Sequence, residues 1–411
     1  MNNTPIAGDG ARQRARVVAA LGTAQTLAWA SSYYLPAMLA VPMARELGVS
    51  VPTVFAAFST ALALSALVGP YAGGAIDRWG GRPVLVATNL VFAAGLVGLG
   101  LAQGPAGLFA AWIVIGIGMG SGLYEAAFSA LVRLYGSQSR NAITGITLFA
   151  GFASTVGWPL TTLLEAEVGW RGACFVWAGL HLLLGAPLNA SLPRPPRAGA
   201  RASVASTGDS AAPPGSSGNL RAAMLLSFVF AVTWFVSTAM AAHLPALIMA
   251  GGATLATAVA VGALVGPAQV AGRLVEFGLL RRVHPLLSAR LASLMHPLGA
   301  GVLVLAGAPG AAAFALLHGA GNGILTIAKG TLPLVLFGPQ GYGARQGLLM
   351  VPARIAQALA PWVFGIGLEL WGAGALWLSS VLGLAAFGAL MLLRGGDPMP
   401  RWSAAPESGR R

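Results

Sequence analysis

Long hydrophobic runs alternate with short clusters of proline, glycine and charged residues along the whole of this 411-residue chain. A helix needs about 20 mostly apolar residues to cross the roughly 30 Å hydrocarbon core of a bilayer. Twelve runs meet this requirement, so the pattern predicts an all-α membrane protein with twelve transmembrane helices. The predicted spans are approximately 17–43, 53–76, 83–103, 106–132, 141–164, 172–192, 222–249, 255–279, 287–307, 310–336, 345–368 and 372–393.

The predicted spans form two groups of six, separated by a polar segment at 194–220. This segment is rich in proline, serine, glycine and arginine, a composition typical of flexible linkers. We therefore expect five regions along the chain: an N-terminal tail at 1–16, a six-helix bundle at 17–193, the linker at 194–220, a second six-helix bundle at 221–394 and a C-terminal tail at 395–411.

Composition agrees with a membrane protein and excludes other classes. Hydrophobic residues make up 56% of the chain and charged residues 9%, against about 25% charged residues in a soluble domain. A soluble or disordered chain is excluded. The single cysteine, Cys174, rules out a disulfide framework and a cysteine-rich metal site. The chain has no phosphate-binding G-x-x-x-x-G-K-[ST] loop and no catalytic cluster. We therefore expect no enzyme, cofactor or metal site, and no ATP-driven transport.

Basic residues lie mostly on one side of the predicted membrane topology. The chain has 24 Lys and Arg against 11 Asp and Glu, a formal net charge of +13. Nineteen basic residues fall on the side that holds both termini, and two, Arg45 and Arg171, fall on the other. Because cytoplasmic loops retain arginine and lysine, this predicts an inner-membrane protein with both termini in the cytoplasm. The basic residues are scattered over separate segments, so no nucleic-acid partner is expected.

Two short motifs recur in the two groups of spans. ALVGP occurs at 66–70 and at 263–267, and GIGMG at 116–120 matches GAGNG at 319–323. The matches fall on corresponding spans at nearly one offset, 197 and 203 residues, which predicts a duplicated six-helix unit. Transporters built from such repeats bind substrate between the halves and move one half against the other.

The segment after the second predicted span reads Gly73-Gly-Ala-Ile-Asp77-Arg78-Trp-Gly80-Gly-Arg82-Pro. It resembles the signature loop between helices 2 and 3 of the major facilitator superfamily, G-x-x-x-D-[RK]-x-G-[RK]-[RK]. The matching residues are Gly73, Asp77, Arg78, Gly80 and Arg82, whereas Gly81 stands where a basic residue is usual. The resemblance implies two pseudo-symmetric six-helix bundles, secondary transport by alternating access, and a gating loop that latches the outward-facing state.

The eighth span carries a degraded copy of this motif, Gly272-Arg273-Leu-Val-Glu276. By the same resemblance, Arg273 and Glu276 would take part in gating, with Glu276 close enough on the helix to neutralise Arg273. Gly73 would let the second helix approach a neighbour closely. The alternative is that Asp77 and Glu276 only anchor helix ends, and both interpretations remain open.

Two departures from the family pattern weaken an assignment as a proton-coupled drug exporter. Such exporters often carry an arginine on helix 4 in R-x-x-x-G-x-x-x-G, but here Trp112 precedes Gly116 and Gly120. On the fifth span, the antiporter pattern ending in Gly-Pro is present only loosely, as Gly157-Trp-Pro159.

Ionisable side chains inside predicted spans are functional candidates, since each costs roughly 2.5–3.5 kcal/mol to place in hydrocarbon. Glu125 lies on the fourth span, Lys329 on the tenth and Arg354 near the middle of the eleventh. In the family that the chain resembles, helices 1, 4, 7 and 10 line the cavity. The candidate substrate and cavity residues are therefore Arg354, Lys329, Asn322, His318, Gln25, Trp29, Tyr33, Trp234 and Gln357.

Two interpretations of the in-span charges are open. In one, Glu125 forms a structural ion pair with Lys329 or with Arg354. In the other, Arg354 and Lys329 bind an anion and Glu125 carries a proton, because desolvation favours its neutral form and a nearby cation its charged form.

The expected function is secondary active transport of a small solute across the inner membrane, coupled to protons or to exchange. In-span charges are three positive (Arg273, Lys329, Arg354) and two negative (Glu125, Glu276), which favours an organic or inorganic anion. The alternative is proton-coupled efflux of an amphipathic drug or metabolite, which the aromatic residues would suit. A membrane sensor or scaffold without transport is a third possibility. The expected partners are the solute, protons and the lipid bilayer, and the protein is expected to be a monomer.

Overall fold

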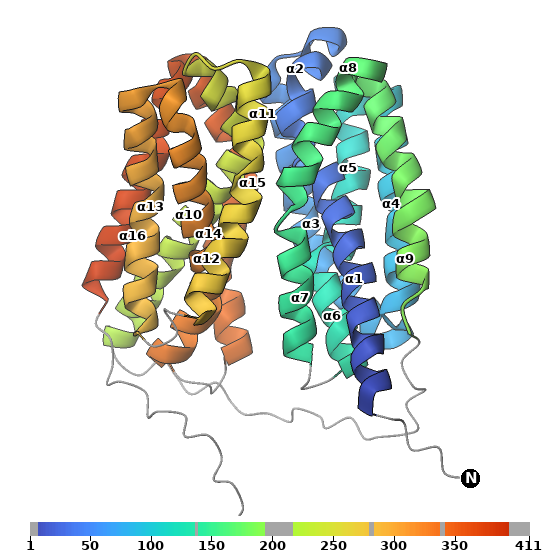
Figure 1. The fold of residues 1–411 in the computed structure, drawn as a ribbon, viewed down its shortest axis with the longest axis horizontal. Coiled ribbons are helices and arrows are strands. Elements are labelled where there is room, and N and C mark those ends of the chain that lie inside the picture. Colours follow the sequence, from blue (N-terminus) through green and yellow to red (C-terminus); the bar gives the residue numbers. More distant parts are fainter. Residues whose placement is uncertain (1–6, 136–138, 194–216, 279–282, 338–341, 394–411) are drawn as a thin grey trace, which may run out of the picture.

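The structure is a computed structural model that describes residues 7–135, 139–193, 217–278, 283–337 and 342–393. Within these residues all regular structure is helical. Figure 1 shows two helical bundles side by side, α1 to α9 in one and α10 to α16 in the other. The predicted all-α architecture in two bundles is therefore confirmed. The C-terminal tail and most of the linker lie outside the described residues, and α1 begins within the predicted N-terminal tail.

The N-terminal half contains α1 (Ala7–Ser31), α2 (Pro36–Leu47), α3 (Val51–Trp79), α4 (Gly81–Leu101), α5 (Pro105–Gly122), α6 (Tyr124–Tyr135), α7 (Arg140–Ala150), α8 (Ala153–Leu180), a π-helical turn (His181–Gly185) and α9 (Ala186–Ala190). The C-terminal half contains α10 (Ser217–Ala250), α11 (Leu255–Ala263), α12 (Val265–Gly278), α13 (Pro285–Ala306), a 3₁₀ turn (Ala308–Gly310), α14 (Ala311–Phe337), α15 (Tyr342–Trp371), a 3₁₀ turn (Gly372–Gly374) and α16 (Ala375–Leu392).

The described part of the chain has nine stretches long and apolar enough to cross a membrane, and two of them contain a reversal. In 145–190 the chain turns back at Gly169, whose φ of +70° suits glycine. Trp177 Nε1 donates to Thr161 Oγ1 at 3.2 Å, although 16 residues span about 24 Å in a straight helix. The stretch 348–392 turns back at Gly372–Gly374. The helices α1 and α2 lie before the first of the nine stretches and correspond to the first predicted span. The architecture is therefore consistent with the twelve predicted spans.

Several spans consist of two helices rather than one, which the hydrophobic pattern does not reveal. The first breaks between Ser31 and Pro36, and the fourth breaks at Leu123. Proline cannot donate a backbone hydrogen bond to the preceding turn, so α2 begins anew at Pro36. The break at Leu123 places Glu125 in the first turn of α6, where the helix dipole favours a negative charge.

The glycine repeat marks equivalent close contacts in the two halves. A Cβ added to Gly120 would lie 2.6 Å from the carbonyl oxygen of Ser65 on α3, and one added to Gly323 would lie 2.3 Å from that of Gln269 on α12. Gly116 and Gly319 contact Ala61 and Val265 in the same way. The 203-residue offset therefore corresponds to a structural equivalence between the halves.

The two ALVGP segments do not occupy equivalent positions in the two halves, so the 197-residue offset predicted from them is wrong. The glycine contacts pair Ala61 with Val265 and Ser65 with Gln269, an offset of 204 rather than 197 residues. The two ALVGP segments are thus displaced by about two helical turns. By the same offset Gly272 corresponds to Val68 and not to Gly73, so the motif on α12 is not an in-place copy of the loop after α3. Frequent Gly and Ala let short motifs match by chance.

The two halves contact each other mainly on the side away from the start of α1, which we call the far side. The Tyr33 hydroxyl donates to Thr238 Oγ1 at 2.8 Å, and Thr155 Oγ1 donates to the Ala263 carbonyl at 2.7 Å. The ring of Phe55 lies 3.9 Å from that of His243. Figure 1 shows α2, α8 and α11 at this end of the molecule, opposite the N-terminus.

Glu46, beyond the predicted end of the first span, organises the far side of the N-terminal half. Its carboxylate accepts from Arg171 Nε at 2.7 Å and from Trp170 Nε1 at 2.5 Å. Arg171 also donates to the Gly100 carbonyl, and its guanidinium lies over the Trp170 ring. These hydrogen bonds, from Arg171 first and then from Trp170, lower the pKa of Glu46 below its usual value.

We expect Glu46→Gln to lower the melting temperature of the purified protein at neutral pH. A carboxylate whose pKa is lowered by folding stabilises the folded protein at pH values above its unfolded-state pKa of about 4.3. This stabilisation is lost as the pH falls through the folded-state pKa. The deficit should therefore shrink on acidification. Glu167→Gln, at an exposed residue nearby, is the control. A deficit of equal size at every pH would contradict the assignment.

Candidate functional site

An ion pair between Glu125 and Arg354 joins the two halves near the middle of the predicted membrane. Glu125 lies in the first turn of α6 and Arg354 near the middle of α15. Both side chains are partly exposed, and Arg354 Nη1 also donates to Gln357 Oε1 at 3.4 Å. Of the two partners predicted for Glu125, the structure selects Arg354. The pair spans the boundary between the halves at the level where substrate was predicted to bind.

Trp234 on α10 brings the two predicted cations together. Lys329 Nζ lies 4.3 Å from the centroid of the Trp234 ring, and Arg354 Cζ lies 5.8 Å from it. A cation within about 6 Å of an indole ring is attracted by the negative face of its π system. Lys329, on α14, is buried, and Arg354 is partly exposed. Three helices of the C-terminal half, α10, α14 and α15, therefore supply one aromatic and cationic surface.

The N-terminal half contributes a group of aromatic side chains next to Glu125. The Trp29 ring lies 5.0 Å from that of Tyr33 and 4.9 Å from that of Tyr124, and Tyr124 stacks on Phe128. The Tyr33 hydroxyl donates to Thr238 on α10, the helix that also carries Trp234. Tyr124 was missed by the sequence analysis, although it immediately precedes Glu125. Its role depends on the helix break at Leu123, which has no strong signal in the sequence.

Three buried indole N–H groups have no hydrogen-bond partner among the described residues, those of Trp29, Trp112 and Trp234, and two of them belong to candidate site residues. These two are Trp29 on α1 and Trp234 on α10, which are 205 residues apart in the chain. The hydrogen-bonded residues Tyr33 and Thr238 have the same separation. The two tryptophans are therefore equivalent positions of the repeat. A buried donor left unpaired costs about 1–3 kcal/mol, which a bound acceptor would offset.

Three other candidates lie outside this cluster. Gln25 is buried within the N-terminal half and donates to the Gly122 carbonyl at 2.6 Å. His318 and Asn322 line a cavity inside the C-terminal half, where His318 contacts His296, a residue the sequence analysis did not select. Of the nine predicted substrate and cavity residues, contacts join Arg354, Lys329, Trp234 and Gln357 in the C-terminal half and Trp29 with Tyr33 in the N-terminal half, and Tyr33 reaches α10 through Thr238.

The loop motif after α3 has two glycines with clear steric roles. Gly80 links α3 and α4 with a φ of +90°, a conformation that favours glycine. A Cβ added to Gly81 would lie 2.3 Å from that of Ala130, which explains why no basic side chain stands at this position. No atom lies within 4 Å of a Cβ added to Gly73, so the close approach predicted there is absent in this conformation.

The charged residues of the motif lie at the surface on the side where α1 begins. Asp77 and Arg78 are exposed and Arg82 is partly exposed. Arg133 donates to the backbone carbonyl of Asp77, and the ion pairs of the described residues do not include Asp77. The gating role of this loop therefore stays a prediction.

Arg273 contacts the other half rather than its predicted neighbour. Its Nη1 donates to the Thr147 carbonyl on α7 at 2.8 Å. The expected neutralisation by Glu276 is wrong for this conformation, since Arg273 reaches across to α7 and the ion pairs of the described residues do not include Glu276. Glu276 is buried, and its Oε2 has no partner among the described residues.

The fold and the site can be compared with known proteins. Residues 21–311 match the model of the Major Facilitator Superfamily. The chain belongs to this family. The resemblance seen in the loop after α3 is thereby confirmed, and the chain is a membrane-embedded transporter by family.

One relative and two solved structures add to this comparison. The chain is 28% identical, over 89% of its length and 92% of the relative's, to an uncharacterized 38 kDa protein in the 23S RNA operon of Thermoproteus tenax. It is similar to a bacterial homolog of the human lysosomal transporter Spinster in an inward-facing, occupied conformation (TM-score 0.67, 17% identity, 92% and 96% of the two chains). It is also similar to a mutant of the nucleoside transporter NupG (TM-score 0.74, 13% identity, 92% and 99%). At these identities the structures establish only the shared fold.

Proposed function

We propose that this protein is a secondary active transporter that moves a small organic or inorganic anion across the inner membrane by alternating access. The site is the cluster of Arg354, Lys329, Trp234, Trp29 and Glu125 between the halves. Family membership supports transport, and the distribution of basic residues supports cytoplasmic termini. The proposal needs no catalytic residue, cofactor or second protein.

The observation that carries the anion assignment is the unpartnered indole donors of Trp29 and Trp234, the second of which lies against two cations. A ligand that satisfies Trp29 Nε1 and Trp234 Nε1 must supply hydrogen-bond acceptors. Carboxylate, phosphate and sulfonate groups supply several acceptors and a negative charge. An arginine binds such groups through charge-assisted hydrogen bonds, which are roughly twice as strong as neutral ones. The ring faces suit an apolar portion of the same ligand.

The Glu125–Arg354 pair suggests how binding and gating are linked. While Glu125 holds Arg354, the two halves are joined across the site. An arriving anion would replace the Glu125 carboxylate on Arg354, and a proton taken up by Glu125 would favour this exchange. In this scheme Arg354 is paired with Glu125 in one state and binds the anion in the other. Arg273, through its bond to Thr147, would form a second contact between the halves that breaks during the cycle.

Glu125→Gln should weaken the pH dependence of uptake between pH 5.5 and 8. Glutamine keeps the size of the side chain but can neither bind a proton nor neutralise Arg354. Radiolabelled uptake into liposomes at a series of pH values measures this, with Glu167→Gln as the control at an exposed carboxylate outside the site. An uptake profile that keeps the wild-type pH dependence in Glu125→Gln would show that Glu125 does not carry the proton.

A second candidate, proton-coupled efflux of an amphipathic drug or metabolite, is favoured by the aromatic group of Trp29, Tyr33, Tyr124 and Trp234. The two candidates differ in their need for the cations. Anion transport requires Arg354 and Lys329, whereas the export of a hydrophobic compound should largely persist without them.

A thermal-shift screen of the purified protein tests the proposal. The panel would contain organic acids, metal oxyanions, sugars, nucleosides and amphipathic drugs, because a ligand that binds only the folded state raises the melting temperature. We expect stabilisation by one or more anions and none by sugars or neutral nucleosides. Stabilisation by uncharged or cationic compounds alone would contradict the anion assignment.

A further inference from the structure

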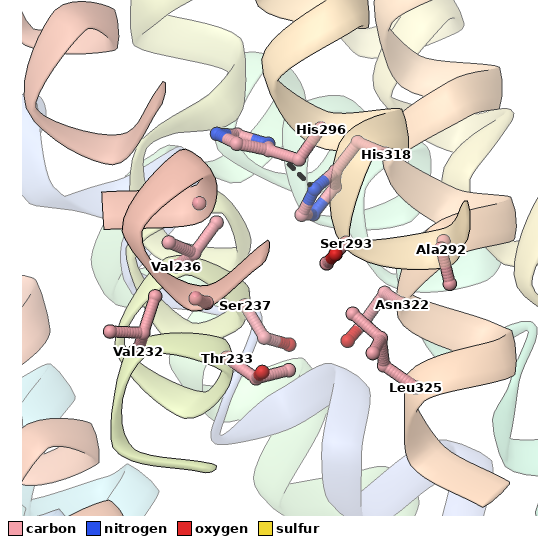
Figure 2. Close-up of a pocket in the computed structure, with 13 residues that line it drawn as sticks. Val232, Thr233, Val236, Ser237, Ala292, Ser293, His296, His318, Asn322 and Leu325 are labelled. Atoms are coloured by element: carbon pink, nitrogen blue, oxygen red, sulfur yellow. Dashed lines mark hydrogen bonds between the residues drawn. The ribbon is translucent and has the colours of Figure 1, made fainter. Parts of the chain in front are cut away.

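The C-terminal half contains a cavity that is separate from the cluster at Arg354 and is lined by both apolar and polar side chains. Its volume is about 40 Å³, and it lies between α10, α13, α14 and α16. Its polar lining consists of Thr233, Ser237, Ser293, His296, His318 and Asn322. Figure 2 shows these side chains around one space, with the two histidines on one side of it. A water molecule needs roughly 10–15 Å³ measured in this way, so the cavity has room for about three.

The two histidines form a hydrogen-bonded pair. His296 Nδ1 and His318 Nδ1 are 3.0 Å apart, and His296 Nε2 lies 3.0 Å from Ser379 Oγ on α16. The Ser379 hydroxyl donates to the Leu376 carbonyl, so its oxygen accepts from His296 Nε2. With its proton on Nε2, neutral His296 presents a bare Nδ1. His318 must then carry its proton on Nδ1 and donate it to His296.

This assignment leaves the lone pair of His318 Nε2 available. His318 lines both the cavity and a smaller neighbouring space, and no hydrogen bond from a described residue occupies its Nε2. A proton added at this nitrogen leaves both the Nδ1–Nδ1 and the Nε2–Oγ hydrogen bonds intact. The pair can therefore take up one proton without rearranging.

Among the described residues, His296 and His318 are the titratable groups that line the cavity, and Tyr34 of the N-terminal half lines the smaller neighbouring space that His318 also borders. The described residues of α10 and α16 that line the cavity carry no charge. Gln269 of α12, which lines the neighbouring space, is also uncharged. The Phe314 ring contacts both imidazoles. Further along the packed helices, Arg290 on α13 is bonded to the Leu390 and Leu393 carbonyls. Lys329 on α14 and Arg273 and Glu276 on α12 lie further towards the end where α1 begins.

Two neighbouring spaces that share lining residues lie between the pair and the boundary between the halves. Ser237, His318 and Asn322 line both the cavity and the smaller space, and the smaller space is also lined by Tyr34 and Trp158 of the N-terminal half. Protons could therefore reach His318 from the region where the halves separate. The free energy of placing a charge there falls as water gains access. Proton affinity would thus differ between the two conformations of a transport cycle, which is what coupling requires.

We propose that the His296–His318 pair is a proton-binding site of this protein, with the proton held on His318 Nε2. Imidazole is the side chain that ordinarily changes its charge near neutral pH. The other buried histidines differ: both ring nitrogens of His181 are occupied by Ser31 and Asn89, and His243, whose Nε2 is bonded to the Pro361 carbonyl, lines neither of the two spaces. Proton binding stands on this geometry alone, whereas a role in coupling rests on the proposed transport function.

The test is an NMR titration of the full-length protein in lipid nanodiscs, with ¹⁵N in the imidazole rings of its five histidines. The ¹⁵N shifts report which ring nitrogen carries a proton. Coupling across the Nδ1–H···Nδ1 hydrogen bond identifies the pair in the wild-type protein, and His318→Gln and His296→Gln confirm the assignment where they fold. The control is His181, which should stay neutral throughout.

At pH 8 we expect the Nδ1–H form of His318 and the Nε2–H form of His296. As the pH is lowered to 4, the pair should take up one proton, at His318 Nε2, while His296 keeps its form. The proposal is overturned if both rings stay neutral to pH 4, if His296 is protonated first, or if the opposite tautomers are found. No solute is present in this titration, so its outcome is independent of whether transport of an anion is observed.

Discussion

Replacing Arg354 by glutamine should weaken binding of the transported anion roughly 10- to 150-fold, and Lys329→Gln should act in the same direction. Hydrogen bonds to a charged group contribute about 1.5–3 kcal/mol, which corresponds to this range of dissociation constants. Both cations lie against Trp234, so the loss of either removes part of one binding surface. Isothermal titration of the purified protein with the anion found by the screen measures the effect.

Arg354→Gln also leaves Glu125 without its partner, and this must be separated from the loss of the cation. The double variant Glu125→Gln/Arg354→Gln removes the unpaired carboxylate. If the weak binding persists in the double variant, the guanidinium itself contacts the anion. Arg45→Gln, at an exposed arginine outside the site, is the control for net charge. Unchanged affinity in both Arg354→Gln and Lys329→Gln would exclude the cluster as the binding site.

Gly120→Ala and Gly323→Ala should each destabilise the protein by about 1–3 kcal/mol, the usual cost of overpacking a close contact. The added methyl group would lie 2.6 Å and 2.3 Å, respectively, from a backbone carbonyl oxygen of the neighbouring helix. Backbone atoms cannot move aside as a flexible side chain can. The melting temperature of the purified protein measures the effect.

Gly388→Ala on α16 is the matched control, since no atom lies within 4 Å of the added Cβ. There alanine should be neutral or stabilising by up to about 1 kcal/mol, because it has the higher helix propensity. Equal melting temperatures for Gly323→Ala and Gly388→Ala would mean that α12 and α14 do not pack as closely as described.

The architecture could be predicted from the sequence because it depends on one-dimensional patterns. The lengths of the apolar runs specify the helices, and the loop from Gly73 to Arg82 specifies the family. The GIGMG and GAGNG motifs were also informative, since each glycine corresponds to a contact that excludes a side chain.

The site could be predicted only in part, because side-chain pairing depends on the rotation and depth of each helix. Two alternative partners are open for Glu125 from the sequence, and the structure pairs it with Arg354 after a helix break at Leu123 that the sequence does not signal. His296 and His318 are 22 residues apart on adjacent helices, and no spacing rule relates them. The ALVGP motif predicted the wrong alignment of the two halves, because a match of five common residues does not determine helical register.

Uptake by the protein reconstituted in liposomes tests whether the cluster at Arg354 and Lys329 carries an anion across the membrane. The anion selected by thermal shift would be supplied outside the vesicles under an imposed substrate or pH gradient. We expect saturable uptake by the wild-type protein that collapses in Arg354→Gln and in Lys329→Gln. An anion that binds but never crosses under either gradient, or one that crosses equally well in both variants, would contradict this expectation.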